Sequence, residues 1–208
     1  MTSELPRLPS RLPPFAPGLR IGLFGGSFNP AHDGHRLASL TALRRLQLDR
    51  VWWLVTPGNP LKAHGPAPLA ERIAQARHIV HDPHVEVTGI EAQLGTRMTR
   101  DTLAALQGLY PRVRFVWLMG ADNMVQFDRW DSWREIAARV PIGVIARPGW
   151  RMPARFSRAA RMLWRDRQPE TQAGQLADMV PPAWALINVP LNKQSSSAIR
   201  KRLQRTKT

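Results

Sequence analysis

The chain has 208 residues, 43% of them hydrophobic, and a formal net charge of +15. This composition favours one globular domain over a disordered chain. The sequence holds no cysteine, which excludes disulfides and thiolate metal sites and suits a reducing cytoplasm, the location we expect. The excess of basic residues predicts attraction to polyanions, among them nucleic acid, acidic membranes and phosphorylated small molecules.

Residues 1–18 contain five prolines and no apolar run typical of a secretory signal. We expect them to form a flexible extension ahead of a single domain at 19–208. No stretch of the sequence reaches the roughly 18 apolar residues of a membrane span, so no membrane association is predicted.

From residue 19 onward, short apolar or aromatic runs alternate with segments whose apolar residues recur every three or four positions. The predicted elements, in chain order, are strand 19–24, helix 36–48, strand 50–58, helix 68–81, strand 84–89, helix 99–110, strand 113–120, helix 131–140, strand 142–147, one or two short helices within the arginine-rich segment 148–182, strand 184–190 and helix 195–205. Such alternation predicts an α/β fold, a Rossmann-like doubly wound parallel sheet with flanking helices. In these sheets ligands bind at the carboxyl ends of the strands, near the point where the strand order reverses.

The segment "GLFGGSFNPAHDGH" (22–35) follows the first predicted strand and opens the first predicted helix. Its glycine spacing does not fit G-x-G-x-x-G, and it lacks the Gly-Lys-Ser/Thr of a Walker A loop. Glycines allow close backbone approach to a phosphate, and the first turn of a helix offers unpaired N–H groups to an anion. His32 and His35, three residues apart, can donate hydrogen bonds to phosphate oxygens.

Two other interpretations of this segment remain open from the residues alone. A zinc site would need a third ligand, for which His64, His78, His81 and His84 are candidates, although none forms a known zinc pattern with His32 and His35. The segment can also be a purely structural glycine turn with histidines facing solvent.

Motifs at both ends of the chain resemble one family. "GGSFNPAHDGH" (25–35) resembles the first motif of the HxGH nucleotidylyltransferase superfamily, and "SSSAIR" (195–200) is similar to its second. Between them, "TPGNPLK" (56–62), "TRMTRDTL" (96–103), "LMGADNMVQFDRW" (118–130) and "VIARPG" (144–149) resemble blocks of the nicotinate-nucleotide adenylyltransferase family. The resemblance implies a nucleotidylyltransferase fold and transfer of the adenylyl group of ATP to nicotinate mononucleotide, which gives nicotinate adenine dinucleotide and pyrophosphate in NAD biosynthesis.

The resemblance also implies site residues. His35 would stabilise the transition state at the α-phosphate, with His32 and Arg200 as its catalytic partners. ATP would be bound by Gly25, Gly26, Ser27, Phe28, His32, His35, Gly120, Asp122, Arg147, Ser196, Ser197 and Arg200. The mononucleotide would be bound by Lys62 at its phosphate, by Thr99 in the loop that meets its carboxylate, and by Trp130 stacked on its ring.

Mg²⁺ is expected with ATP, held through phosphates and water, because no carboxylate cluster suggests a protein cage. The expected partners are the small-molecule substrates ATP and nicotinate mononucleotide, without nucleic acid or membrane.

Several alternatives stay open. Asp122 can be a helix N-cap, Arg147 a surface charge and Trp130 a core residue. The acceptor can be nicotinamide mononucleotide, since Met98 stands where the nicotinate loop often carries tyrosine, or phosphopantetheine, although His32 argues against it. A basic RNA-binding protein is the alternative from another class, but the arginines carry no recognised RNA-binding motif.

Overall fold

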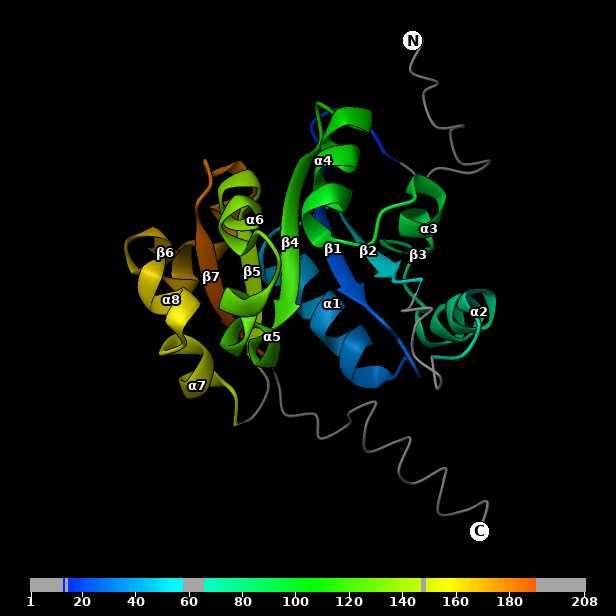
Figure 1. Ribbon diagram of the computed structural model, residues 1–208, viewed down its shortest axis with the longest axis horizontal. Helices are drawn as coiled ribbons and strands as arrows, with labels where there is room; N and C mark the ends of the chain where they lie inside the picture. The colour runs from blue at the N-terminus through cyan, green and yellow to red at the C-terminus, as the bar shows by residue number, and fades with distance from the viewer. Residues whose placement is uncertain (1–12, 14, 58–65, 147–148, 190–208) are drawn as a thin grey trace.

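The computed structural model describes residues 13, 15–57, 66–146 and 149–189, which form one sheet with helices on both faces (Figure 1). The elements in chain order are β1 (Arg20–Gly26), α1 (Asp33–Arg45), β2 (Arg50–Val55), α2 (Leu69–Ile79), β3 (Val85–Thr88), α3 (Ile90–Leu94), α4 (Thr99–Leu109), β4 (Arg114–Gly120), α5 (Ala121–Val125), the 3-10 helix η1 (Phe127–Arg129), α6 (Trp133–Arg139), β5 (Ile142–Ala146), α7 (Arg151–Arg155), α8 (Arg158–Met162), η2 (Trp164–Asp166), β6 (Arg167–Gln168), η3 (Glu170–Asp178) and β7 (Trp184–Asn188).

The sheet has seven strands in the order β3-β2-β1-β4-β5-β7-β6, and every neighbouring pair is parallel. The chain builds outward from β1 in two directions, first through β2 and β3 and then through β4 and β5. The order therefore reverses between β1 and β4, and ligands of such sheets bind at the carboxyl ends of the strands beside that point. The predicted doubly wound parallel sheet is confirmed.

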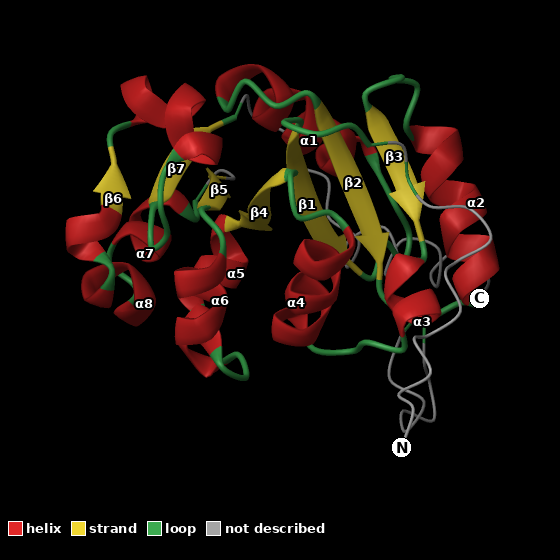
Figure 2. Ribbon diagram, turned by 90° about the horizontal axis from the view of Figure 1, so that it is seen from above, coloured by secondary structure: helices red, strands yellow, loops and turns green. Residues whose placement is uncertain are grey.

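Two buried apolar clusters, one on each face, hold the sheet in place. Ile21 and Leu23 of β1 pack into the cluster beneath α3 to α8, whereas Phe24 packs into the cluster beneath α1, α2 and η3. Figure 2 shows these two groups of helices on opposite faces. Because both faces are covered, the central strands need apolar residues at nearly every position, which explains their continuous apolar runs.

The predicted and observed elements differ at particular places. β1 continues through Gly25 and Gly26, which pair with Leu54 and Val55, so the prediction ended this strand two residues early. The five-residue helices α3 and α5 were not predicted, because so short a segment shows little periodicity. The segment 148–182 contains α7 and α8, as expected, and adds η2, the edge strand β6 and η3. The predicted helix 195–205 lies outside the described residues.

Among the helices of the described residues, none is long and apolar enough to cross a bilayer.

Candidate active site

The carboxyl end of β1 lies at the reversal point and carries the glycines of the first motif. A Cβ atom at Gly25 would come within 2.7 Å of the Trp117 ring of β4, so this position has no room for a side chain. Positive φ angles at described glycines occur at Gly18, Gly95 and Gly149. The left-handed residue of the motif is instead Phe28, with φ of 45°. Gly25 and Gly26 therefore permit close packing rather than an unusual backbone conformation.

His32 and His35 form a reciprocal cap at the start of α1. The Nδ1 atom of His32 accepts a hydrogen bond from the backbone N–H of Gly34 at 3.1 Å, and Nδ1 of His35 accepts one from the backbone N–H of His32 at 3.3 Å. The two rings lie 3.9 Å apart between centroids. The structure thus brings the two predicted histidines together. It also modifies the expectation that the first turn of this helix offers unpaired N–H groups to an anion, because the N–H of Gly34 already donates to an imidazole.

These caps define the chemistry that the imidazoles offer. A ring nitrogen that accepts a hydrogen bond carries no proton, so in the neutral rings the proton lies on Nε2. Both histidines are therefore Nε2–H donors at the positive end of the α1 dipole, in the place where an anion is stabilised. His32 is buried and His35 is half-buried, which strengthens their hydrogen bonds to a phosphate.

An aromatic stack supports His35 from below. Phe28 lies against Trp53 of β2 with ring centroids 4.6 Å apart and planes 9° from parallel, and the His35 ring lies 4.9 Å from Phe28. The indole N–H of Trp53 donates to Ser39 Oγ at 2.6 Å, and that hydroxyl donates to the backbone carbonyl of His35 at 3.0 Å. β2 thus fixes both the ring and the backbone of His35.

Arg72 of α2 is a fully buried guanidinium beside this segment, and sequence reasoning missed it. It donates to four backbone carbonyls: Ser27 at 2.7 Å, Thr56 at 2.8 Å, Pro57 at 3.3 Å and Ala67 at 2.7 Å. One side chain thereby ties together the loop after β1, the loop after β2 and the start of α2.

Burial disfavours the charged form of Arg72, and the position of this residue on its helix could have been noticed in the sequence. Removal from water lowers its pKa from the usual value, since the charged form is desolvated. Arg72 lies three residues after Leu69 and four before Ala76, on the helix face that packs against the sheet. A charged residue on the apolar face of a predicted helix was the feature that could have identified Arg72.

Trp130 lies on the other side of the reversal point. It is half-buried, and its ring meets Trp117 and Phe127 edge to face, at centroid distances of 6.5 Å and 5.5 Å. Trp117 also fills the space over Gly25, so one indole joins the glycines of β1 to Trp130. Trp130 is therefore a partly exposed ring beside the candidate phosphate site.

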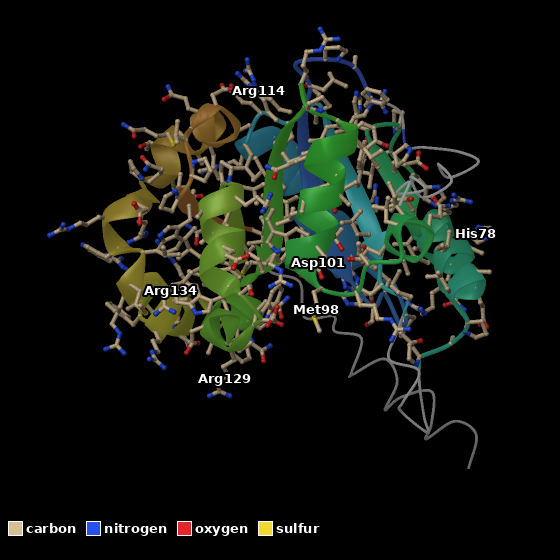
Figure 3. The ribbon with its side chains drawn as sticks, turned by 45° about the horizontal axis from the view of Figure 1, so that its top comes forward. His78, Met98, Asp101, Arg114, Arg129 and Arg134 are labelled. Carbon is tan, nitrogen blue, oxygen red and sulfur yellow. The ribbon has the colours of Figure 1, made fainter. Side chains whose placement is uncertain are left out.

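Arg100 lies next to Thr99 in the first turn of α4, and it joins this helix to the turn after Trp130. Its guanidinium donates to Ser132 Oγ at 2.8 Å and lies 3.6 Å from the Asp131 carboxylate. Figure 3 shows Met98 at this end of α4, close to Asp101. Thr99 is half-buried at the first position of α4. The structure thus holds two of the predicted mononucleotide-binding residues on adjoining segments.

Glu91 of α3 is a buried acid that packs against the first turns of α4. It is 4% exposed, and its Oε1 accepts a hydrogen bond from the Thr102 hydroxyl, which lies 2.9 Å from the hydroxyl of Thr96. Burial raises the pKa of the Glu91 carboxyl from its usual 4.5 to about 7, although the hydrogen bond from Thr102 acts in the opposite direction. Sequence reasoning did not select this residue.

We expect Glu91 to make the stability of the fold depend on pH. Since the folded chain holds this proton more tightly than the unfolded chain, the free energy of unfolding falls as pH rises from about 4.5 to about 7 and is level above that. The loss is on the order of 3 kcal/mol. Glu91→Gln keeps the acceptor for Thr102 and removes the titration. Urea unfolding at pH 5, 6, 7 and 8 should therefore show that the variant becomes more stable relative to wild type as pH rises from 5 to 7. A constant difference across these pH values would contradict the assignment.

Gly120 and Asp122 lie where β4 ends and α5 begins. A Cβ atom at Gly120 would overlap the Asp122 carboxylate as it is placed, so the two residues lie in close contact. The alternative of Asp122 as N-cap is wrong, because Gly120 is the N-cap and no side chain caps this helix. Asp122 is half-buried in the first turn of α5, at the carboxyl edge of the sheet.

Several predicted residues lie outside the described residues, and their assignments stay predictions: Lys62, Arg147, Ser196, Ser197 and Arg200. His64, a candidate zinc ligand, lies there too.

The remaining candidate zinc ligands are far from the histidine pair in the fold. His84 precedes β3, and His78 and His81 lie at or beyond the end of α2, all at the amino edge of the parallel sheet. His32 and His35 lie at the carboxyl edge. His84 is exposed and pairs with Asp82 at 3.1 Å. The described residues contain no cluster of three or more potential metal ligands.

The fold and this site define a nucleotide-binding transferase of the cytidylyltransferase-like class, and the family model of that description matches residues 23–202. A probable nicotinate-nucleotide adenylyltransferase of Roseobacter denitrificans is 57% identical over 180 residues, which cover 86% of this chain and 90% of that protein. One from Methylorubrum extorquens is 54% identical over 185 residues, covering 88% of this chain and 100% of that protein. The chain belongs to the nicotinate-nucleotide adenylyltransferase family, which confirms the resemblance of its motifs.

Solved structures agree on the fold. The nicotinic acid mononucleotide adenylyltransferase of Plasmodium falciparum, complexed with NaAD, superposes with a TM-score of 0.65 at 18% identity, covering 88% of this chain and 83% of that one. A putative nicotinate-nucleotide adenylyltransferase of Vibrio parahaemolyticus gives a TM-score of 0.55 at 19% identity, covering 90% and 88%.

Proposed function

We propose that this chain transfers the adenylyl group of ATP to nicotinate mononucleotide, giving nicotinate adenine dinucleotide and pyrophosphate. The observation that carries the proposal is identity of 54–57% to relatives named for this reaction, over nearly the whole length of both chains. The site at the carboxyl ends of β1 and β4 supports it, since it offers donors for phosphates beside a partly exposed aromatic ring. ATP is abundant in the cytoplasm, and we place the reaction there.

The reaction needs alignment and charge stabilisation more than proton transfer. The 5′-phosphate of the mononucleotide is an anion at pH 7, so it can attack the α-phosphorus of ATP without a general base. A bond forms between the attacking oxygen and this phosphorus, and the bond from the phosphorus to the bridging oxygen breaks, releasing pyrophosphate. The protein must hold two mutually repelling anions in line and stabilise the charge on the transferring group.

The residues of the site suit these tasks. His35, fixed by Phe28 and its backbone, would donate its Nε2–H to the α-phosphate as charge builds up there. His32 would hold ATP phosphates together with the backbone of Gly25, Gly26, Ser27 and Phe28. Gly120 and Asp122 would line the adenosine side. Beyond the described residues, Arg147 would join that side, Arg200 with Ser196 and Ser197 would grip the β- and γ-phosphates, and Lys62 would bind the mononucleotide phosphate.

Mg²⁺ is proposed to enter with ATP. The donor set of the described residues, which has no cluster of metal ligands, fits an ion held by phosphates and water rather than by a protein cage. Bound there, the ion would offset the charge of the triphosphate.

The direct test is pyrophosphate release by the pure protein with ATP and Mg²⁺. Nicotinate mononucleotide, nicotinamide mononucleotide and phosphopantetheine are supplied in separate reactions. We expect turnover with the first and little with the other two. Preference for the amide would correct the acceptor, and turnover with none of them would refute the proposal.

Trp130→Ala should separate acceptor binding from ATP binding. Stacking of a base on an aromatic side chain contributes about 1–3 kcal/mol, so loss of the ring should raise the KM for nicotinate mononucleotide about tenfold. The KM for ATP should change much less. Phe15→Ala, at an exposed aromatic side chain that precedes β1, is the control and should leave both values unchanged. Equal increases for both substrates would show that Trp130 does not stack on the pyridine.

A further inference from the structure

The segment from α7 to β6 is strongly basic. Its first helix, α7, packs against α5, whereas Arg167 begins the edge strand β6 beside the amino end of β7, at the edge of the sheet opposite the histidine pair. It carries six arginines and one acidic residue, Asp166, between residues 151 and 167. Figure 1 shows α7, α8 and β6 at one end of the sheet, away from α1 and β2. Within the described part of the chain, Arg158 reaches a carboxylate, Asp128 at 3.8 Å, whereas no carboxylate lies within 4 Å of Arg151, Arg155 or Arg167.

Arg167 is held in place by aromatic rings rather than by an acid. Its guanidinium lies 5.7 Å from the centroid of the Trp164 ring and 5.6 Å from that of Trp184. The indole N–H of Trp184 donates to the backbone carbonyl of Leu163 at 2.7 Å, which fixes one of these rings. An arginine stacked on aromatic faces keeps its N–H edge free to bind an anion.

Two donors in this cluster are buried without a hydrogen-bond partner among the described residues. They are the Nε atoms of Arg155 and Arg167. A buried donor of a charged group that lacks an acceptor costs free energy, and such groups are rare unless a ligand or water completes them. Trp164, Arg167, Gln168 and Pro169 line a cavity of about 340 Å³, so Arg167 is the arginine of this pair that faces it. That volume is within the range of small-molecule sites, about 300–1,000 Å³.

The positive charges here act on one another. Burial, and then the charges of Arg155 and Arg151, lower the pKa of Arg167. Like charges gathered without a counterion destabilise the folded chain, and a bound anion would relieve both this repulsion and the two unpaired donors. Guanidinium groups match the oxygens of a phosphoryl group, which carries close to two negative charges.

We propose that Arg167, assisted by the positive charges of Arg155 and Arg151, forms a second binding site for a phosphoryl group, at the edge of the sheet opposite the site of adenylyl transfer. The ligand is free phosphate or a phosphate-bearing small molecule. For a nucleotide, the exposed ring of Trp164 offers a face on which the base can stack. The proposal does not depend on the proposed reaction.

The indole N–H resonance of Trp164 in ¹H–¹⁵N spectra reports on this site directly, because the ring lies against Arg167. The resonance is assigned with Trp164→Phe, and inorganic phosphate is titrated into the full-length protein at constant ionic strength. We expect a saturable shift in wild type and in Arg161→Gln, an exposed arginine of the same segment. Arg167→Gln and Arg155→Gln should each weaken the apparent affinity at least tenfold. The other indole resonances check that the variants remain folded. If Arg167→Gln does not fold, the result for Arg155→Gln tests the proposal.

Adenosine monophosphate serves as a second probe in the same experiment. If adenosine monophosphate binds more tightly than phosphate, and this advantage is lost in Trp164→Ala, the ligand is a nucleotide. Calorimetry measures the binding to Trp164→Ala, since it does not depend on the tryptophan resonance. Equal affinity identifies the phosphoryl group alone. A linear shift that sodium chloride reproduces, or equal affinities in wild type, Arg155→Gln and Arg167→Gln, would overturn the proposal.

Discussion

Replacement of His35 by alanine is expected to lower kcat by about 10²-fold or more, the usual effect of removing a donor to a transition-state anion. The Nδ1 atom of the ring is engaged by the backbone N–H of His32, so the ring has Nε2–H as its donor toward a substrate. Alanine removes that donor and the cap together. The loss should appear in kcat more than in the KM for ATP, since the donor acts mainly where charge develops. Steady-state rates of pyrophosphate release measure both.

Two further variants separate chemistry from capping. In His35→Asn the amide oxygen can replace Nδ1 as acceptor, so we expect a stable protein with little activity. In His35→Gln the amide nitrogen can approach the place of Nε2, so we expect part of the activity to return. His78→Ala, at an exposed histidine near the other edge of the sheet, is the matched control and should have normal rates. Normal kcat in His35→Asn would show that His35 is a structural cap only.

The sequence predicted the architecture, and it indicated where the candidate site lies, because both depend on local sequence patterns. Continuous apolar runs mark strands that are covered on both faces, and Gly25 and Gly26 follow the run that becomes β1. The reciprocal cap of His32 and His35 needs only residues three apart, which lie one helical turn from each other. The place of this turn at the end of the first strand then put it at the edge where ligands bind.

Local sequence patterns could not predict contacts between residues that are far apart in the chain. Nothing near Phe28 in the sequence shows that its left-handed backbone brings its ring onto Trp53, because the partner belongs to another strand. In the sequence Glu91 does not differ from other charged residues, because its burial arises only when α3 packs in the folded chain. The burial of the Arg155 and Arg167 Nε atoms, away from any acceptor of the described residues, likewise arises only when distant segments pack together.

Arg72→Met should destabilise the fold by about 3 kcal/mol or more, since it leaves buried carbonyls without donors while keeping the helix-forming aliphatic stem. The carbonyls of Ser27, Thr56, Pro57 and Ala67 belong to three segments, and the guanidinium donates to all of them. Urea unfolding of variant and wild type at pH 7 measures the difference. Arg77→Met is the matched control: it lies on the same helix but donates to one carbonyl, that of Val87, and should cost at most about 1 kcal/mol.

Arg72→Lys then tests whether the clamp serves the site as well as the fold. Lysine keeps the charge but replaces a planar fork of five donors with a single ammonium, so it cannot reach carbonyls on three segments at once. We expect it to recover part of the stability and still raise the KM for both substrates several-fold. Ser27 lies in the proposed ATP cradle, and Thr56 and Pro57 come shortly before Lys62 in the sequence. Normal KM values in a destabilised Arg72→Lys would show that the clamp holds the fold without positioning the site. Equal stability of Arg72→Met and Arg77→Met would show that these carbonyls find other donors when the guanidinium is gone.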